Sequence, residues 1–173
     1  MGEVYLARDT KLERKVALKV LLAEVASHRD RLDRFIREAK AAAALNHQNI
    51  AHIYEISESE GINFIVMELI EGQTLRTRIR QGPLGLQEIL DITTQSASAL
   101  VAAHEASIIH RDIKPENVMI RGDGITKLLD FGLAKLMIDK DARVDTSAPT
   151  VLNIKTKPGI VMGTTSYMSP EQA

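Results

Sequence analysis

The 173-residue sequence contains no cysteine, and its charges nearly cancel. Without cysteine, neither a disulfide framework nor a zinc site built on thiolates can form, and the composition fits a reducing compartment. Lysine and arginine together number 22, against 23 aspartate and glutamate residues. A protein whose main partner is nucleic acid or an anionic membrane needs a basic excess, and this sequence has none. We therefore expect neither as the main partner.

Long apolar runs are also missing from the sequence. No run approaches the roughly 20 residues of a membrane span, and residues 1–4 lack the basic and apolar regions of a signal peptide. We therefore expect a soluble, cytoplasmic protein. The length is sufficient for one domain with a hydrophobic core, or for two small lobes that share a cleft.

The first part of the chain predicts a small antiparallel sheet with one helix. Short apolar runs, partly β-branched, alternate with polar turns and indicate strands. Between them lies a stretch in which apolar residues recur at steps of three and four, as on one face of a helix. The predicted elements are strands at 5–7 and 16–22, a helix at 30–45, and strands at 50–56 and 62–70 around a turn at 57–61.

The pattern becomes mainly helical after residue 70, and we place a lobe boundary there. The elements predicted beyond it are a short helix at 74–80, a long helix at 86–105, and strands at 118–120 and 127–129. On the long helix, the predicted inner face carries Leu86, Ile89, Leu90, Thr93, Ala97, Leu100 and His104. Residues 135–157 are polar and aperiodic, and a loop of that length is usually functional or disordered.

The strongest chemical signal is the run His110-Arg111-Asp112-Ile113-Lys114-Pro115-Glu116-Asn117. Chance gives its five informative positions roughly once in three million start positions. The competing interpretation, a charged loop after a helix, therefore has little weight. Asp130-Phe131-Gly132 follows thirteen residues after Asn117, while Val16-Ala17-Leu18-Lys19 lies upstream on a predicted strand, before Glu38 on the next helix.

The order and spacing of these segments resemble the signature set of protein kinases over essentially the whole chain. The resemblance implies an α+β, two-lobed protein-kinase-like fold: a small antiparallel sheet lobe with one helix, and an incomplete, mainly helical lobe. Residues 1–173 would form a partial protein kinase domain. Its small lobe (1–70) would lack the first strand, and its large lobe (71–173) would reach the end of the activation segment.

The resemblance also implies an enzyme that transfers the γ-phosphate of ATP to serine or threonine hydroxyls of a protein substrate, with Mg²⁺ as cofactor. Lys19 would hold the α- and β-phosphates and pair with Glu38. Asp130 and Asn117 would hold the metal, because Mg²⁺ prefers hard oxygen ligands. Taken singly, Lys19 is equally compatible with an ordinary strand lysine, and Glu38 with a solvated helix face.

Three further residues carry implied roles in the transfer. Asp112 would orient the acceptor hydroxyl and take its proton, and Lys114 would reach the transferred phosphate. Thr164 would brace this aspartate and lysine. Lys114 and Thr164 favour serine or threonine over tyrosine as the acceptor.

The resemblance to protein kinases also implies a nucleotide pocket. Gly2 belongs to the end of the glycine-rich loop, Val4 and Ala17 would cover the adenine, and Met119 would lie beneath it. The other residues of this implied pocket are Met67 at its back and Glu68, Leu69 and Ile70 in the hinge. A column of Ala42, Ile53, His110 and Phe131 would link the lobes. For the apolar residues, plain core packing is an equally good and compatible interpretation.

Arg111 suggests regulation, because in kinases with this arginine a phosphate on the activation segment pairs with it and orders the loop. The candidate sites are Thr146, Ser147, Thr150 and Thr156, of which we favour Thr156 in its lysine-flanked stretch. An unmodified threonine remains an alternative. Dimerisation for autophosphorylation is a further expectation.

The sequence departs from the family pattern at both ends. Only the last part of the glycine-rich loop is present, as Gly2-Glu3-Val4, and the chain stops at Ala173 after the activation segment. We therefore expect a fragment of a longer kinase. Related kinases often carry a membrane span outside the kinase domain, and the parent protein would be anchored in the same way by a segment outside this chain. Residues 3–7 and 167–173 resemble phrases common in eukaryotic-like kinases of bacteria.

A non-catalytic, kinase-like binding or scaffold module is the alternative function. Degenerate kinases usually lose at least one catalytic residue, whereas Lys19, Asp112, Asn117 and Asp130 are all present here. This favours an active parent protein. For the isolated chain, we expect little or no activity.

Overall fold

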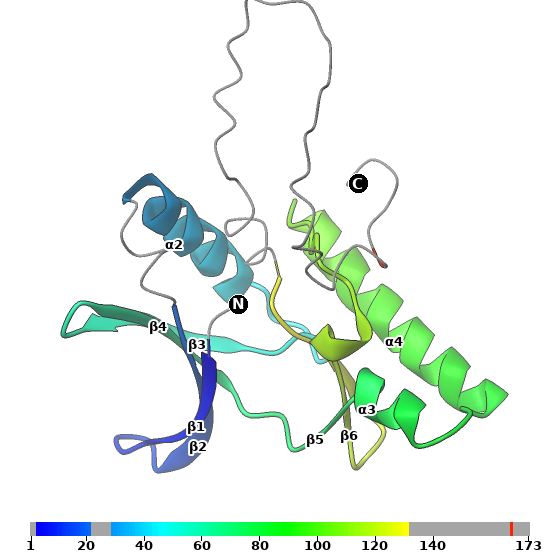
Figure 1. The fold of residues 1–173 in the computed structure, drawn as a ribbon. Helices are drawn as coiled ribbons and strands as arrows, with labels where there is room; N and C mark the ends of the chain where they lie inside the picture. Colours follow the sequence, from blue (N-terminus) through cyan, green and yellow to red (C-terminus); the bar gives the residue numbers. More distant parts are fainter. Residues whose placement is uncertain (1–2, 22–28, 132–166, 168–173) are drawn as a thin grey trace, which may run out of the picture.

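The computed structural model describes residues 3–21, 29–131 and 167, whose arrangement Figure 1 shows. The first half is a four-stranded antiparallel sheet covered by a helix, and the second half is a long helix packed beside a smaller, three-stranded sheet. In chain order the elements are β1 (Glu3–Asp9), β2 (Arg14–Val20), α2 (Arg29–Ala43), β3 (Ile53–Ser59), β4 (Ile62–Glu68), β5 (Gly72–Thr74), α3 (Leu75–Arg80), α4 (Leu86–Glu105), the short 3-10 helix η1 (Pro115–Asn117), β6 (Val118–Arg121) and β7 (Thr126–Leu128).

The larger sheet has the strand order β1-β2-β4-β3, with every pair antiparallel. Its central strand β2 is rich in β-branched and apolar residues, and Val16 and Ala17, on opposite faces, are both buried. A tight turn at Glu60 and Gly61 joins β3 to β4, and both residues have positive φ angles, of 53° and 77°. Paired positive φ angles match the right-handed twist of a hairpin, so this turn fixes the register of the two strands.

Helix α2 packs on this sheet through one apolar stripe. Phe35 and Ala39 are almost completely buried against Ala17, Ile65 and Met67. Fully burying one side chain of the size of Phe35 stabilises the fold by about 1.5–3 kcal/mol. The stripe therefore holds α2 beside the strand that carries Lys19 and places Glu38 on the side of the second half.

The second half of the chain has its own core, which is continuous with the first. Buried residues of α4, β6 and β7 pack together with the end of α2; they are Ala42, Leu45, Ile50, Ile92, Ala99, Ala103, Val118, Leu128 and Phe131. Ile53 contacts both cores. The backbone also joins the halves, because Leu128 donates to the Asn49 carbonyl at 2.8 Å and accepts from the Ala51 amide at 2.9 Å.

The helix and strand predictions are confirmed in type and differ mainly at their ends. Helix α4 has the predicted bounds. Strand β3 begins at Ile53 rather than at residue 50, because residues 49–52 bond to β7 and to the end of β4 instead of continuing the ladder. The sequence did not predict β5, which pairs with β6. Its Gly72 lies so close to the Ile120 carbonyl that a Cβ atom would overlap it.

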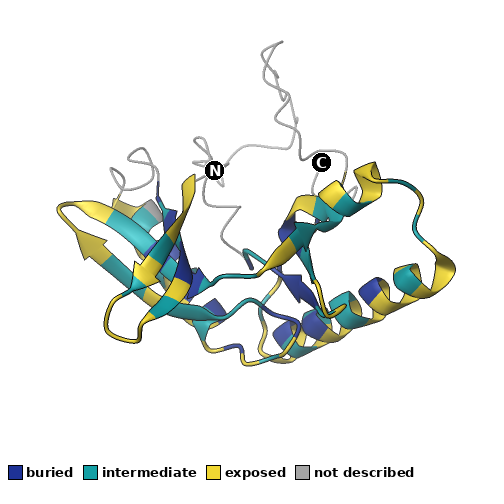
Figure 2. Ribbon diagram, turned by 90° about the horizontal axis from the view of Figure 1, so that it is seen from below, coloured by how far each residue is buried: buried dark blue, intermediate teal, exposed yellow. Residues whose placement is uncertain are grey.

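The predicted inner face of α4 is wrong for most of its residues, and of its members only Leu100 packs against the core. Ile92, Ala99 and Ala103 are the buried residues of this helix, whereas Leu86 is 74% exposed and Leu90 is 50% exposed. Figure 2 shows this alternation of buried and exposed residues along α4. The helix carries apolar residues around much of its surface, so spacing alone does not choose a face. The two alanines let α4 approach β7 closely, and that contact decides the face.

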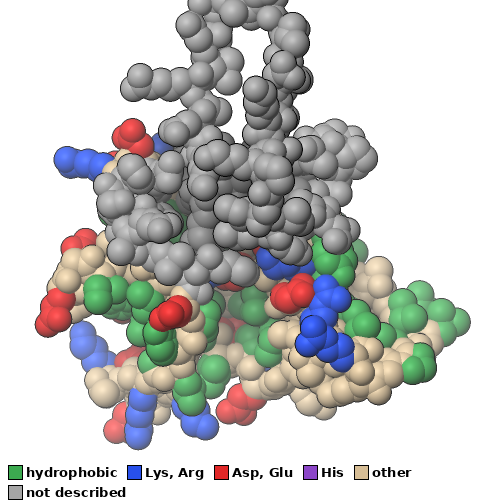
Figure 3. All heavy atoms as spheres, viewed as in Figure 1, with side chains coloured by type: hydrophobic (Ala, Val, Ile, Leu, Met, Phe, Trp, Pro, Cys, Tyr) green, Lys and Arg blue, Asp and Glu red, His purple; other side chains and the backbone are tan. Residues whose placement is uncertain are grey.

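The surface of the described residues mixes charges of both signs. In the view of Figure 3, lysine and arginine side chains alternate with aspartate and glutamate over both halves, and no extended region of one sign is visible among them. Of the helices in residues 3–21 and 29–131, none is long and apolar enough to cross a membrane.

Candidate functional site

The loop between α4 and β6 buries three polar side chains together. Asp112, Lys114 and Asn117 are each less than one tenth exposed. The Asn117 side-chain nitrogen donates to the Asp112 carbonyl at 2.8 Å and to its Oδ2 at 3.0 Å. Lys114 Nζ lies 2.6 Å from the same Oδ2. Since buried charges need partners, this mutual arrangement fixes the orientation of the Asp112 carboxylate.

Local structure positions these three residues. The 3-10 helix η1 begins with Pro115, whose fixed φ angle suits a first helical position. The Asn117 amide donates to the Lys114 carbonyl at 2.9 Å, which closes the turn. The Asn117 carbonyl in turn accepts from the Leu129 amide at 2.9 Å. This last bond brings the loop against the end of β7, next to Asp130.

Helix α3 holds the outer edge of the same loop. Its Arg76 Nε lies 2.7 Å from Glu116 Oε1, and its Nη2 donates to the Tyr167 hydroxyl at 2.7 Å. The hydrogen bond from Arg76 lowers the pKa of Glu116. Because Glu116 and Tyr167 are exposed, these contacts contribute little to the stability of the fold. Their main effect is to hold the loop in place against α3.

His110 anchors the loop from inside the molecule and is only 1% exposed. Its Nδ1 accepts from the Asp112 amide at 3.3 Å, so its Nε2 carries the hydrogen donated to the Leu129 carbonyl at 2.8 Å. The ring packs on Phe131 with 4.6 Å between centroids. Burial lowers the pKa of His110, although its hydrogen bond and the nearby Asp112 and Asp130 oppose this effect. Of the residues in the predicted column, His110 contacts Phe131, and Ala42 and Ile53 belong to the same core as Phe131.

The protein should lose stability on acidification because of His110. Its pKa in the folded state lies below the ordinary value of 6.5, so the unfolded chain binds the proton more readily. The stability that neutral His110 contributes is therefore fully present above pH 6.5 and is lost as the pH falls towards the folded pKa. Protonation would also place a hydrogen on Nδ1 of His110. This N–H group would then face the N–H group of Asp112, and the hydrogen bond between them would be lost.

Urea unfolding at a series of pH values would measure this effect. His110→Gln retains one donor and one acceptor but does not titrate, so its free energy of unfolding should fall less steeply than that of the wild type below pH 6.5. Equal slopes for the two proteins would contradict the assignment.

The expected ion pair between Lys19 and Glu38 is wrong for this structure. Lys19 Nζ lies 2.7 Å from Asp130 Oδ1, and both side chains are largely buried. Glu38 instead pairs with Arg111, at 3.4 Å between Oε1 and Nη1. The other carboxylate oxygen of Glu38 is buried without a hydrogen-bond donor among the described residues. The two acidic and two basic side chains allow either pairing, and the position of α2 relative to the loop selects this one.

Two of these charged residues have an unusual backbone conformation. Arg111 and Asp130 have φ angles of 66° and 60°, in the left-handed region that favours glycine. Such a conformation costs on the order of 1–3 kcal/mol and persists only where surrounding contacts impose it, although aspartate tolerates it better than most residues. Both outliers lie where the ion pairs of the site converge.

The described residues that were predicted to contact the adenine lie in the two sheets and in the connection between them. Ala17 and Met67 are directly opposite each other on β2 and β4, and both are buried. Val4 lies opposite Lys19 and is 60% exposed. Met119 is on β6, opposite Thr74. Glu68 ends β4, and Ile70 follows it in the connection to β5.

Some predictions lie outside the described residues. These are Gly2, Thr164 and the candidate phosphorylation sites Thr146, Ser147, Thr150 and Thr156. Conversely, the sequence analysis assigned no role to Lys127, which forms a buried ion pair with Glu68. The available signal was a lysine at the start of a predicted strand, three residues before Asp130.

The donor atoms near Asp130 fit a magnesium ion with phosphate as co-ligand. The Asn117 side-chain nitrogen is engaged by Asp112, which leaves the amide oxygen for a metal. Asp130 supplies a carboxylate. Within the described residues there is no cluster of three or more His, Asp or Glu side chains that would form a metal site of its own. Mg²⁺ characteristically takes one or two carboxylate or amide oxygens and completes its shell with phosphates and water.

Comparison with known proteins identifies protein kinases as the relatives of this chain. A model of the protein kinase domain matches residues 1–172. The serine/threonine-protein kinase PknB of Mycobacterium leprae is 41% identical over the whole chain, which covers 27% of that protein. PrkC of Bacillus subtilis, also named a serine/threonine-protein kinase, is 42% identical, and the chain covers 25% of it. The chain thus spans about a quarter of the length of these relatives.

Solved structures show the same relationship. The crystal structure of the Mycobacterium tuberculosis PknI kinase domain superposes with a TM-score of 0.70 at 34% sequence identity. The alignment covers 78% of this chain and 55% of the PknI chain.

Proposed function

Because the chain belongs to the protein kinase domain family, we propose that the protein transfers the γ-phosphate of ATP to serine or threonine hydroxyls of protein substrates. The printed names of its relatives, serine/threonine-protein kinases, support this acceptor class. The observation that carries the proposal is the buried arrangement of Asp112, Lys114 and Asn117, in which Asn117 and Lys114 both contact one oxygen of the aspartate.

In this proposal Asp112 orients the acceptor hydroxyl and accepts its proton. Its Oδ2 is occupied by Asn117 and Lys114, so Oδ1 is the atom for the acceptor. A positioned base of this kind contributes about a hundredfold to ten-thousandfold to the rate. The ammonium group of Lys114 would offset the charge of the transferred phosphoryl group, since phosphoryl transfer depends mainly on positioning and electrostatic stabilisation. Thr164 would brace these two residues.

Asp130 and Asn117 would hold Mg²⁺, which neutralises phosphate charge when it is bound. Lys19 would contact the α- and β-phosphates. Its 2.7 Å contact with Asp130 supports the proposal, because it places a cation beside the carboxylate that would hold the metal. When nucleotide enters, Lys19 would exchange part of this contact for phosphate oxygens.

The adenine would lie between the two sheets. Ala17 and Val4 would cover it from the larger sheet, with Gly2 nearby in the glycine-rich loop, and Met119 would support it from β6. The hinge after Met67 would bond the adenine edge through backbone groups of Glu68 and Ile70. The apolar character of Ala17, Val4 and Met119 suits a flat, weakly polar ring system.

Arg111 and Glu38 would regulate the enzyme. A phosphate on the activation segment, for which Thr156 is our candidate, would pair with Arg111. Glu38 would then be released from its 3.4 Å contact and become available to Lys19. The buried, unpartnered oxygen of Glu38 supports this exchange, since an unmet acceptor favours a new donor. In a dimer, one copy would transfer this phosphate from ATP to the activation segment of the other copy.

A non-catalytic binding module is the second candidate. The engagement of Glu38 by Arg111 is the observation that favours it, because phosphate transfer in the protein kinase family requires the lysine and the helix glutamate to be paired. Incubation of the full-length protein with γ-labelled ATP, Mg²⁺ and a protein rich in serine and threonine distinguishes the two. The kinase proposal predicts labelled phosphoserine or phosphothreonine. Nucleotide binding without any transfer would support the binding module.

A further inference from the structure

A buried ion pair lies behind the hinge and has no role in the mechanism above. Lys127 Nζ lies 2.7 Å from Glu68 Oε2, and the two side chains are only 10% and 19% exposed. Glu68 ends β4, where the connection to the second half begins, and Lys127 is on β7, three residues before Asp130. The pair therefore links the proposed adenine-binding backbone to the strand that leads to the proposed metal ligand.

The same pair holds a third segment, the loop between α2 and β3. The His52 amide donates to Glu68 Oε2 at 3.2 Å, and the Glu68 amide donates to the His52 carbonyl at 2.8 Å. Lys127 Nζ also donates to the Ile50 carbonyl at 3.4 Å. Two side chains thus join the hinge, the loop and β7 through directional contacts.

A buried ion pair is a weak explanation of stability. Replacing such a pair by apolar residues of similar volume is often neutral or stabilising, because desolvation of the charges offsets their attraction. Removing only one partner is strongly destabilising, since the other charge stays buried and unpaired. What the pair provides, and an apolar contact lacks, is a fixed direction and distance.

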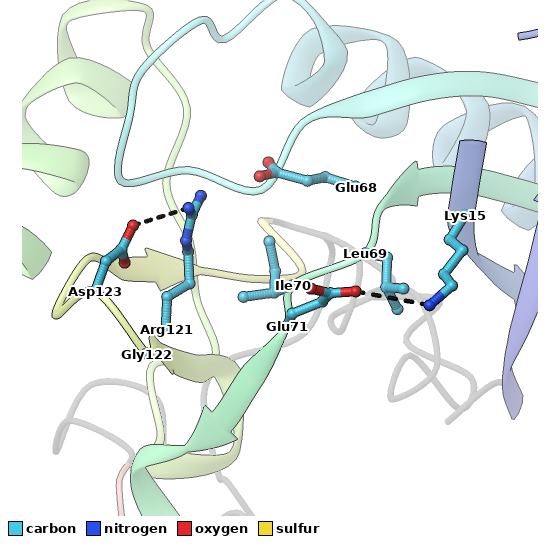
Figure 4. A pocket seen from close by; sticks show the side chains of 8 residues that line it. All are labelled: Lys15, Glu68, Leu69, Ile70, Glu71, Arg121, Gly122 and Asp123. Atoms are coloured by element: carbon cyan, nitrogen blue, oxygen red, sulfur yellow. Dashed lines mark hydrogen bonds and ion pairs between the residues drawn. The ribbon is translucent and has the colours of Figure 1, made fainter. Parts of the chain in front are cut away.

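The outer side of the hinge is weakly held. A cavity of about 460 Å³ lies along it, lined by Lys15, residues 68–71 and residues 121–123. In Figure 4 the Glu68 side chain points away from Lys15, which pairs instead with Glu71 across the cavity. That pair is long, at 3.9 Å, and both side chains are mostly exposed, so it contributes little. In the described part of the hinge, the pair of Glu68 with Lys127 is the buried polar anchor.

We infer that Lys127 is a positioning residue for nucleotide binding. Through Glu68 it holds the hinge backbone at the distance from β6 and β7 at which adenine and the metal-bound phosphates can be bound together. The inference rests on the proposed function, and it deepens that proposal by adding a residue that touches neither ATP nor substrate.

The test separates positioning from stability. Lys127→Met leaves Glu68 unpaired and should lower the melting temperature and weaken ADP–Mg²⁺ binding. The double variant Glu68→Leu/Lys127→Met removes both charges, so its melting temperature should return towards the wild type. Its affinity for ADP–Mg²⁺ should nevertheless remain about tenfold weaker, as expected when binding groups are misplaced. Lys15→Met, at the exposed pair on the same hinge, is the matched control and should change affinity less than twofold.

These measurements are made by calorimetry and thermal melting on the full-length protein, with hydrogen exchange of the Glu68 amide as a readout that needs neither nucleotide nor transfer. The exchange of this amide should accelerate in the double variant, because its bond to His52 loses its side-chain support. If affinity returns together with the melting temperature, or if the amide stays protected, the pair is only structural and the inference is wrong. A wild-type protein that binds ADP but transfers no phosphate would overturn the proposed function alone.

Discussion

Replacing Asp112 by alanine should remove nearly all phosphate transfer while leaving nucleotide binding largely intact. The carboxylate would no longer orient the acceptor hydroxyl or take its proton, a loss of about a hundredfold to ten-thousandfold in rate. Nucleotide binding should persist, because the residues proposed to contact the adenine and the α- and β-phosphates lie in β1, β2, β6 and the hinge. Asn117, a proposed metal ligand, keeps its 2.8 Å hydrogen bond to the Asp112 backbone carbonyl in this variant. Transfer of labelled phosphate from ATP to a serine- or threonine-containing protein measures the first effect, and titration with ADP–Mg²⁺ measures the second.

This experiment needs a control for folding, since Lys114 would lose its buried partner 2.6 Å away. Leaving a buried charge unpaired costs about 3–5 kcal/mol. Asp112→Asn preserves the shape of the side chain, so it serves as the second variant and should be equally inactive. Asp123→Ala, which removes an exposed carboxylate in the turn between β6 and β7, should leave transfer unchanged. Substantial turnover in Asp112→Asn would contradict the role of the base.

Replacing Asp130 should also abolish transfer, and it should in addition weaken magnesium-dependent nucleotide binding. Asp130 is the only carboxylate among the proposed metal ligands, so its loss leaves Mg²⁺ with a single amide oxygen from the protein. We expect the affinity gained on adding Mg²⁺ to fall at least about tenfold, because Mg²⁺ is usually bound through one or two carboxylates together with phosphate oxygens. Titration with ADP in the presence of Mg²⁺ and in the presence of a chelator measures this gain.

The choice of variant matters at this position. Asp130 has a φ angle of 60°, which alanine adopts at a cost. Asp130→Asn tolerates the same backbone and removes only the charge, so it isolates the effect on the metal. The Asp112 variants form the matched comparison, because they should lose transfer but keep the gain in affinity from Mg²⁺. Asp130→Asn that retains both transfer and this gain would show that another residue holds the ion.

The sequence alone was sufficient to predict the residues that we propose for the chemistry. Asp112, Lys114 and Asn117 stand within six consecutive residues, so their spacing is a local property that the chain carries into any fold. The structure brings these three together. The same reasoning applies to the elements: the apolar stripe of α2 and a turn within residues 57–61 were predicted, because both are encoded in short stretches of sequence. The structure narrows that turn to Glu60 and Gly61.

Choices between partners far apart in the sequence were decided by the tertiary structure. By charge alone, Lys19 could pair with either Glu38 or Asp130, and the folded chain brings Asp130 to Lys19 and Arg111 to Glu38. The buried face of α4 was selected by its packing on β7 rather than by its period. The ion pair of Lys127 with Glu68 joins residues 59 positions apart. Hydrogen bonds and ion pairs depend on distances of a few ångströms between segments, and those distances exist only once the chain has folded.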